Sequence, residues 1–575
     1  MNWSFSELKK NLKKDTSELK VVKCAVVADS ASQLFCMALK GYGYTQGLNL
    51  QIWEADYDQL SPTIKDEASE LYSFAPDFVI VFHSSKKLLS KFYRKGTGEK
   101  ISFADDFIRY TEDLADTINS KLGCNIIFLN FPEINDSVFG NYANKTDLSF
   151  LYQQRKINFM LMDLARKKAN LHICDVSSVQ NYISSQKLHN PALYVNTDNV
   201  FNLDALPLVA KNVIDIIVPF TGKFKKCLIL DLDNTLWGGI IGDDGIENIQ
   251  IGELGIGKAF TEFQKWIKQL QHRGIILAVS SKNTESIARD AFENHPDMIL
   301  RMDDFAVFAV NWNNKADNIR YIQSVLNIGF DSMVFLDDNP FERAMVKTHI
   351  ADITVPELPE DPAEYLPYLY TQNLFETISF TEEDIKRTKQ YQEEAHRTVL
   401  QQSFVNEDEF LLSLQMTAVV KPIDKFTLPR AAQLTQRSNQ FNLRTVRYSE
   451  EQMKQVVDDK EKYSLTISLK DKFGDYGLIS LLILEKRSDE ELFIDTWIMS
   501  CRVLKRGVEN FVTNELVGLA QENNIKFITG EYLPTPKNGI VKDHYLNLGF
   551  IPKENIRQLN TNEYQLKKTF IKKEA

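Results

Sequence analysis

The sequence predicts an α/β protein of three domains, and its length and two patterns of apolar residues support this prediction. At 575 residues the chain exceeds a single hydrophobic core and has room for about three or four domains of the usual size. In the first two thirds, apolar runs of strand length alternate with amphipathic helical stretches, which indicates mainly parallel, doubly wound sheets. The last third has consecutive strand-like runs before a long helix, which is typical of an α+β domain.

Changes in this pattern predict the domain boundaries. The first domain covers 1–222, with strand-like runs at Val21–Ala28, Phe78–Phe82 and Asn125–Leu129 and helical stretches at Phe103–Leu122 and Leu148–Lys168. The second covers 223–372, with strands at Cys227–Leu230, Ile275–Val279 and Met333–Leu336, and it closes after the proline-rich stretch 355–362. A charged helical linker follows at 373–403. The last domain covers 404–575, with strands at Ser464–Leu469, Gly477–Glu485 and Leu492–Ile498 and a helix at Gly507–Glu522.

The composition predicts a soluble, cytoplasmic protein. Apolar residues make up 43% of the chain and charged residues 25%, which is ordinary for globular proteins. A formal charge of −11 argues against nucleic acid as the main partner. The six cysteines are scattered without metal-binding spacing, as free buried thiols are. No apolar segment has the length of a signal peptide core or a membrane span.

The first candidate site begins directly after the apolar run Cys227–Leu230, which is followed by two aspartates, Asp231 and Asp233. Ligand sites in open α/β sheets collect at such carboxyl ends of strands. Two carboxylates this close repel each other unless a cation or a shared proton intervenes. A solvated turn is the ordinary alternative for an Asp-x-Asp sequence taken alone.

Three further motifs follow in a compatible order. Ser281 ends a buried strand, Lys315 stands where a helix begins, and Asp337 and Asp338 follow the apolar run Met333–Leu336. Each has an ordinary explanation alone, namely a helix cap, a surface charge and a turn. Together with the first pair, the aspartates form an oxygen-rich pocket suited to Mg²⁺, and the serine and lysine supply donors for a phosphate.

The order Asp-x-Asp-x-Thr, Ser, Lys, Asp-Asp resembles the haloacid dehalogenase (HAD) superfamily. Leu-Trp-Gly-Gly after the first motif and Phe-Leu-Asp-Asp-Asn-Pro-x-Glu-Arg at the last narrow the resemblance to the subfamily IIIC, FkbH-like proteins. These motifs span most of 225–365. The resemblance implies a Rossmann-like core, an obligatory Mg²⁺ and phosphoryl transfer through an aspartyl-phosphate.

The resemblance also assigns roles to the motif residues. Asp231 is similar to the nucleophile, which is also a metal ligand, and Asp233 to the acid/base, which binds metal through its backbone carbonyl. Asp337 and Asp338 complete the metal site. The phosphate-binding group consists of Thr235, which supports the first loop, with Ser281 and Lys315.

The interval between Asp231 and Ser281 predicts that the site lacks a cap domain. A helix and a strand already occupy much of this interval, which leaves room for a small flap at 238–252 only. A site without a lid stays open to a bulky substrate. A carrier-protein thioester or another macromolecule fits such access better than an enclosed metabolite.

The last domain carries a second candidate site, for an acyl group or a pantetheine arm. Its strand-to-helix turn at 499–510 resembles the coenzyme A loop of the GNAT acyltransferases, Arg/Gln-x-x-Gly-x-Gly/Ala, and Arg502 and Gly507 fit this pattern. Lys505 replaces the middle glycine, which permits close approach of the backbone to a ligand. The replacement argues against coenzyme A, and the phosphate of a phosphopantetheine arm is the alternative ligand. Cys501 is a candidate carrier of an acyl thioester, with a buried, inert thiol as the alternative. A domain that only docks a partner is the other interpretation.

The first domain resembles the SGNH-hydrolase-like domain that precedes the phosphatase core in FkbH-like proteins. Its first strand ends in Ala-Asp-Ser30, an echo of the Gly-Asp-Ser nucleophile motif. His172 and His189 lack the spacing of a catalytic partner, and a serine without a base is a poor nucleophile. We therefore predict that Ser30 caps a helix and that this degenerate domain serves in binding.

The FkbH-like resemblance implies a function for the whole chain. It implies that a phosphoglycerate-derived glyceryl unit is loaded onto an acyl carrier protein, with removal of the phosphate. The expected partners are then a phosphorylated substrate and the carrier protein. One alternative is a phosphatase and acyltransferase acting on a sugar or surface-glycan precursor. Another is a multidomain binding scaffold with vestigial activity, although the intact aspartate set argues against this for the core.

Overall fold

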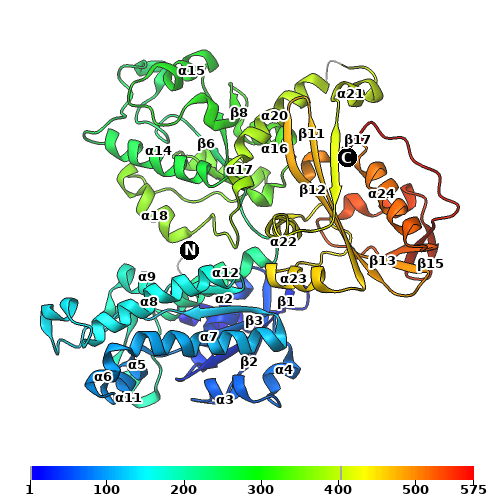
Figure 1. Ribbon diagram of the computed structural model, residues 1–575. Helices are drawn as coiled ribbons and strands as arrows, with labels where there is room; N and C mark the ends of the chain where they lie inside the picture. The colour runs from blue at the N-terminus through cyan, green and yellow to red at the C-terminus, as the bar shows by residue number, and fades with distance from the viewer. Residues whose placement is uncertain (1–2, 402–403, 575) are drawn as a thin grey trace. The chain divides into compact units, whose positions relative to one another are not determined.

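The structure, a computed structural model, describes residues 3–401 and 404–574 and contains three β-sheets. The chain forms two compact units: one runs to residue 218 and includes 449–452, and the other comprises 219–448 and the residues from 453 onward. The first unit holds one sheet and the second unit holds two (Figure 1). The predicted α/β class is confirmed.

The sheet of the first unit has five parallel strands in the order β2-β1-β3-β4-β5. This is the flavodoxin-like order, so the predicted doubly wound fold is confirmed. Its strands are β1 (Lys20–Ala28), β2 (Leu48–Glu54), β3 (Phe78–Phe82), β4 (Asn125–Leu129) and β5 (Leu171–Cys174). The longer helices are α2 (Gln33–Thr45), α5 (Ser85–Tyr93), α7 (Phe103–Leu122), α8 (Phe150–Lys167), α9 (Val176–Ile183) and α12 (Leu206–Phe220). Helices on both faces explain why β3 is apolar and buried at every position.

The first sheet of the second unit has four parallel strands in the order β8-β7-β6-β9. These are β6 (Cys227–Leu230), β7 (Ile276–Ser281), β8 (Phe305–Val310) and β9 (Met333–Leu336), and the helices α14 (Gly257–His272), α15 (Glu285–Asn294), α16 (Lys315–Leu326) and α17 (Pro340–His349) connect or follow them. The chain proceeds outward from β6 to β8 and then returns to the other side of β6. The switch point of this sheet therefore lies between β6 and β9, where ligands bind in open α/β sheets.

The segment between β6 and α14 is a small flap, as predicted. The backbones of Gly238 and Gln250 exchange two hydrogen bonds, of 3.0 and 2.8 Å, which close the segment into a loop. The loop carries one short helix, α13 (Ile241–Asp244). No cap domain is present in this described segment, which confirms the capless core.

The third sheet has eight strands in the order β15-β16-β14-β13-β12-β11-β10-β17. They are β10 (Thr417–Lys421), β11 (Lys462–Asp471), β12 (Gly474–Lys486), β13 (Glu491–Met499), β14 (Phe527–Gly530), β15 (Ile551–Lys553), β16 (Ile556–Asn560) and β17 (Lys572–Lys573), with helices α22 (Leu428–Arg437), α23 (Glu450–Asp458) and α24 (Val508–Glu522). Parallel β14 pairs only with Glu491–Ile494 of β13, so the two strands separate beyond that point. This mixed sheet has the expected GNAT-like, α+β arrangement.

The stretch predicted as a charged helical linker contains two helices, α19 (Glu382–Ile385) and α20 (Arg387–Gln401). Helix α20 contacts β7 and β8 of one sheet and β12 of the other (Figure 1). Its Tyr391 belongs to the apolar core beneath β6. The linker thus packs as part of the second unit, and the predicted boundaries at 222, 372 and 403 stay predictions. Among the described helices, none has the length and apolar character needed to cross a membrane.

Candidate active site

Three carboxylates come together at the switch point between β6 and β9. Leu230 and Leu336 are paired residues at the ends of these strands, and the Asp231 amide donates to the Leu336 carbonyl at 3.0 Å. The residues that follow the two strands therefore lie side by side. Asp231, Asp337 and Asp338 offer oxygens that all lie within 4.8 Å of one another.

Lys315 connects two of these carboxylates. Its Nζ lies 2.7 Å from Asp231 Oδ1 and 2.5 Å from Asp337 Oδ2, and its side chain is 4% exposed. The lysine occupies this position because it is the first residue of α16, behind the cap Asn314. Burial opposes its charge, yet Asp231 and Asp337 hold the pKa of Lys315 above its usual value. The predicted lysine is thus no surface charge.

One ammonium does not balance the clustered carboxylates. Burial, together with the neighbouring Asp231, raises the pKa of Asp337 to about 7. The same two causes raise the pKa of Asp338. The cluster therefore has capacity for further positive charge.

Asp233 lies outside this cluster and is held by three donors. Its Oδ1 accepts hydrogen bonds from Trp237 Nε1 and the Ile241 amide, each at 3.0 Å, and its Oδ2 accepts one from Asn283 Nδ2 at 2.7 Å. Burial raises the pKa of this carboxyl group. A carboxyl group that has a raised pKa and is held in one position by hydrogen bonds is suited to proton transfer.

The remaining predicted residues support the site in different ways. The Thr235 hydroxyl accepts a hydrogen bond from the Asp338 amide at 3.1 Å, so it joins the loops after β6 and β9. Ser281 is buried at the carboxyl end of β7, beside β6. The ordinary explanation of Ser281 as a helix cap does not hold, because Thr284 is the N-cap of α15.

Sequence reasoning assigned no role to three supporting residues. Trp237 and Asn283 hold Asp233, and Arg343 Nη1 donates to the carbonyls of Asp337 and Asp338 at 2.8 and 2.6 Å. All three lie within or beside the motifs. Each has a polar group close to the end of a strand, which is a signal that the sequence does contain. The sequence does not show which residue each of them contacts, because the partners come from other segments of the fold.

A cavity of about 620 Å³ adjoins the carboxylate cluster at Asp338. Asp338, Arg343 and Tyr365 line it, together with Gly238 and Gln250 of the flap. Tyr365 donates to the Asn234 carbonyl at 3.1 Å and so fixes the loop directly after Asp233. The cavity therefore lies beside Asp338 and the flap.

The second set of predicted residues lies beyond the end of β13, in the third sheet. Cys501 is partly exposed, whereas the other five cysteines are buried, and Arg502 is buried with a guanidinium that donates to the Tyr476 carbonyl at 3.1 Å. Gly507 is the N-cap of α24, with φ of 71°. Lys505 also has a positive φ, 62°, which lies in the left-handed region that favours glycine.

The motif of the first unit is arranged differently from the prediction. Ser32 is the N-cap of α2, so the capping role predicted for Ser30 is wrong. The Ser30 hydroxyl is buried and has no hydrogen-bond partner among the described residues, which leaves it without a histidine base. Asp29 instead accepts from His83 Nδ1 at 3.0 Å, a pairing that the sequence reasoning missed.

The second unit has a parallel sheet with clustered carboxylates at its switch point, which is the HAD-like core that the sequence predicts, and a small flap in place of a cap domain. A family model described as the N-terminal domain of FkbH matches residues 23–218. The second comparison is a crystal structure of the N-terminal part of a Bacteroides fragilis protein, containing a phosphatase domain complexed with Mg. It is 51% identical, covers 66% of this chain and 100% of that chain, and has a TM-score of 0.64. The chain belongs to the FkbH-like family.

The last domain is similar to solved acetyltransferases at low identity. The ribosomal-protein-S18-alanine N-acetyltransferase from Escherichia coli is 14% identical, with 25% of this chain and 94% of that chain covered and a TM-score of 0.20. Spermidine N-acetyltransferase from Vibrio cholerae, in complex with CoA and spermine, is 12% identical over 26% and 97%, with a TM-score of 0.21. No curated protein matches the chain.

Proposed function

We propose that the chain transfers phosphoryl groups with Mg²⁺, through an aspartyl-phosphate on Asp231. The observation that carries this proposal is the cluster of Asp231, Asp337 and Asp338, whose oxygens lie within 4.8 Å of one another and which Lys315 joins. Carboxylates are established nucleophiles in phosphoryl transfer. The Bacteroides fragilis relative with its Mg supports the choice of metal.

The donor set fits Mg²⁺. Carboxylate oxygens are the ligands that this cation prefers, and two or three of them leave coordination positions for water and phosphate oxygens. The raised pKa values of Asp337 and Asp338 indicate repulsion that a divalent cation relieves. Bound there, Mg²⁺ would supply positive charge against the phosphate oxygens.

In the first step, an Asp231 oxygen forms a bond to phosphorus and the bond to the leaving oxygen breaks. Asp233 gives its proton to that leaving oxygen. A carboxyl group has about four lone-pair positions, and the three donors to Asp233 leave room for this proton. Lys315, 2.7 Å from Asp231 Oδ1, offsets the charge that gathers around the nucleophile.

In the second step, water attacks phosphorus and the bond between Asp231 and phosphorus breaks. Asp233, now a carboxylate, takes the proton of that water, and Asp231 returns to its ionised form. Inorganic phosphate leaves. Ser281, buried at the end of the neighbouring strand, and Lys315 are the proposed donors to the phosphate oxygens.

We further propose that the substrate is a phosphoglycerate-derived unit destined for an acyl carrier protein. The capless site supports this choice, because a carrier-bound substrate needs open access to the carboxylates. The partly exposed Cys501 and the GNAT-like sheet support a separate place for thioester chemistry, with a pantetheine arm or coenzyme A as the ligand. Intact mass of a carrier protein incubated with enzyme and bisphosphoglycerate tests it: a glyceryl adduct is expected, and an unmodified carrier contradicts it.

The phosphatase activity is tested with para-nitrophenyl phosphate. The wild type should release phosphate with Mg²⁺, lose this activity with a chelator and regain it when Mg²⁺ is returned. Asp231→Asn should lower kcat by about 10³-fold or more, because the nucleophile is lost. Asp243→Asn, in the exposed part of the flap, is the matched control and should keep the wild-type rate. Equal rates for both variants contradict the proposal.

A further inference from the structure

A second cavity, of about 540 Å³, lies between the amino-terminal edge of the β6 sheet and the GNAT-like domain. It is lined by side chains from segments far apart in the sequence: Lys226 directly before β6, Arg387 of α20, Arg430 and Arg437 of α22, and Cys501 and Arg502 after β13. None of these residues contributes to the carboxylate cluster. The cavity is therefore distinct from the site described above.

The cavity carries an excess of positive charge. Six basic side chains line it, the five named above and Lys537, against two carboxylates, Asp331 and Asp352. Two further carboxylates, Glu383 and Asp384, form ion pairs with the lining arginines. With these two included, the described residues of the cavity and their ion-pair partners carry six positive and four negative charges. An excess of two positive charges matches one dianion.

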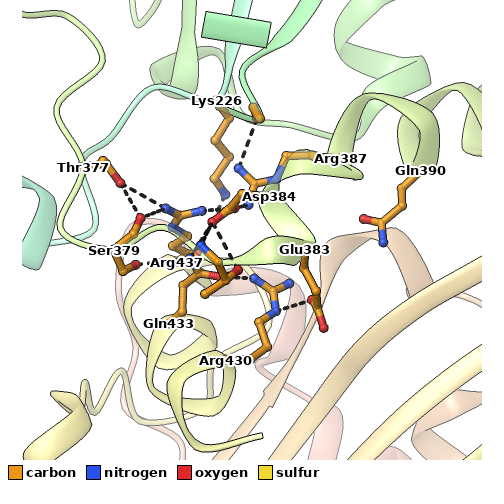
Figure 2. Close-up of polar contacts among 12 residues, drawn as sticks. Lys226, Thr377, Ser379, Glu383, Asp384, Arg387, Gln390, Arg430, Gln433 and Arg437 are labelled. Atoms are coloured by element: carbon orange, nitrogen blue, oxygen red, sulfur yellow. Dashed lines mark hydrogen bonds and ion pairs between the residues drawn. The ribbon is translucent and has the colours of Figure 1, made fainter. Parts of the chain in front are cut away.

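The ion pairs of the cavity, drawn in Figure 2, neutralise only part of its positive charge. Asp384 serves two arginines at once, Arg437 at 2.6 Å and Arg387. Arg430 Nε lies 2.6 Å from Glu383. Lys226 extends into the same group, where its Nζ donates to the Arg437 carbonyl at 3.3 Å, and no carboxylate among the described residues lies within ion-pair distance of it.

Burial makes this arrangement costly without a bound anion. Burial, with Arg387 and Arg437 nearby, lowers the pKa of Lys226 to about 8. Burial, with Arg387 and Arg430 nearby, lowers the pKa of Arg437 to about 9. Cations that repel one another in a desolvated cavity are the usual setting for a phosphate ligand, since guanidinium groups bind phosphate through paired hydrogen bonds.

We propose that this cavity binds a phosphate monoester as its dianion, next to the Cys501 sulfur. The ligand here is not the phosphate that meets Asp231, because Lys226 and Asp231 lie at opposite ends of β6, about 17 Å apart at the rise of an extended strand. The inference stands independently of the chemistry at the carboxylates. Two sources share the required chemistry, a phosphorylated three-carbon acid and the phosphate of a pantetheine arm.

Cys501 provides a local readout, because it lines the cavity and the other five cysteines are buried. Native full-length protein is treated with N-ethylmaleimide, an uncharged reagent, and alkylation of Cys501 is followed by peptide mass. Inorganic phosphate, 3-phosphoglycerate and 4′-phosphopantetheine are the probes, and chloride at equal ionic strength, glycerate and pantetheine are their controls. The phosphorylated probes should slow alkylation in a saturable manner, whereas the controls should not. The phosphorylated probe that protects at the lowest concentration identifies the source.

Lys226→Met tests the cavity itself. Loss of one charge-assisted contact should raise the concentration for half protection by about tenfold, while the para-nitrophenyl phosphatase rate stays unchanged. Lys225→Met is the matched control, because this neighbouring lysine does not line the cavity and its Nζ donates to the Asp331 carbonyl instead. Arg430→Gln gives a second variant, since its partner Glu383 is 30% exposed and can be solvated. Asp231→Asn should keep full protection.

Two results overturn the proposal. One is the absence of protection by all three phosphorylated probes in the wild type. The other is protection that Lys226→Met and Arg430→Gln leave as strong as in Lys225→Met.

Discussion

Asp233 differs from the neighbouring Asp231 in its contacts, although one residue separates them. Asp231 faces Lys315 and the carboxylates after β9, whereas Asp233 is surrounded by the donors Trp237, Ile241 and Asn283. These different surroundings support the two roles that we propose, a nucleophile at Asp231 and an acid/base at Asp233. Pairs of titratable groups whose surroundings differ in this way commonly mark acid/base roles.

Trp237→Phe tests this separation, because it removes the Nε1 donor to Asp233 and keeps an aromatic ring at this fully buried position. We expect kcat to fall by about tenfold, since the acid/base loses one positioning hydrogen bond. This donor lowers the pKa of Asp233, so its loss should move the pH profile of kcat to higher pH. Trp266→Phe, at a tryptophan that packs on Phe263 away from Asp233, is the control. An unchanged rate and pH profile in Trp237→Phe would count against the assignment.

The sequence identified the titratable residues of the site but not their supports. Asp231, Asp337 and Asp338 follow apolar runs, and parallel strands place such residues at one edge. Lys315 gave no such signal alone, and only the motif order distinguished it from a surface lysine. Asn283 and Arg343 act through partners on other strands, which spacing along the chain does not reveal.

Among the elements, α19 makes a contact that holds the linker against the GNAT-like domain. Asp384 accepts from Gln433 Nε2 at 2.9 Å and from Arg437 Nη1 at 2.6 Å, both on α22. Although burial opposes its charge, Arg387 and Arg437 lower the pKa of Asp384 to about 2. The carboxylate is thus a stabilising group that two helices share.

Asp384→Asn should lower the free energy of unfolding at neutral pH by about 3 kcal/mol, since two largely buried arginines lose their counter-charge. Because the folded pKa is depressed, this contribution is present above about pH 4 and is lost as the pH falls towards 2. Urea unfolding of both proteins across this range should therefore converge at acid pH. Asp489→Asn, at an exposed ion pair, is the control and should change little. A constant difference down to pH 2 contradicts this account.

The loop before α24 contains a residue with a side chain, Lys505, in the left-handed backbone region. Lys505 adopts φ of 62°, a conformation that costs a residue with a side chain about 1–2 kcal/mol. Lys505→Gly should therefore raise the free energy of unfolding. The expected gain is about 0.5–1 kcal/mol, because the greater entropy of glycine in the unfolded chain offsets part of the relieved strain. Lys505→Ala removes the same charge and keeps the Cβ, so it should bring no gain. Equal gains in both variants would point to charge instead.

Element positions were predictable where apolar runs were bounded by polar residues. The runs Phe78–Phe82, Cys227–Leu230 and Met333–Leu336 match β3, β6 and β9 residue for residue. The continuous charged pattern predicts a helical linker but does not reveal where one helix ends and the next begins. The break lies at Lys386, two residues after Asp384, whose contacts with α22 are tertiary.

At the scale of the whole molecule, β6 connects two oppositely charged sites. Asp231 follows its carboxyl end and belongs to a cluster with excess negative charge. Lys226 precedes its amino end and lines a cavity with excess positive charge. The first site was predictable from motif order. The second was not, because Lys226, Arg387 and Arg437 come from separate segments whose local sequences are ordinary for surface residues.

Capture of the phosphorylated enzyme tests the central claim most directly. Para-nitrophenyl phosphate has a leaving group that needs little protonation, so Asp233→Asn should slow the attack of water more than the attack of Asp231. With Mg²⁺ and an acid quench, peptide mass should then find a phosphoryl group on Asp231, accumulating in Asp233→Asn above the wild-type level. The account is contradicted if Asp231 carries no phosphoryl group while the enzyme turns over, or if Asp231→Asn releases phosphate at the wild-type rate.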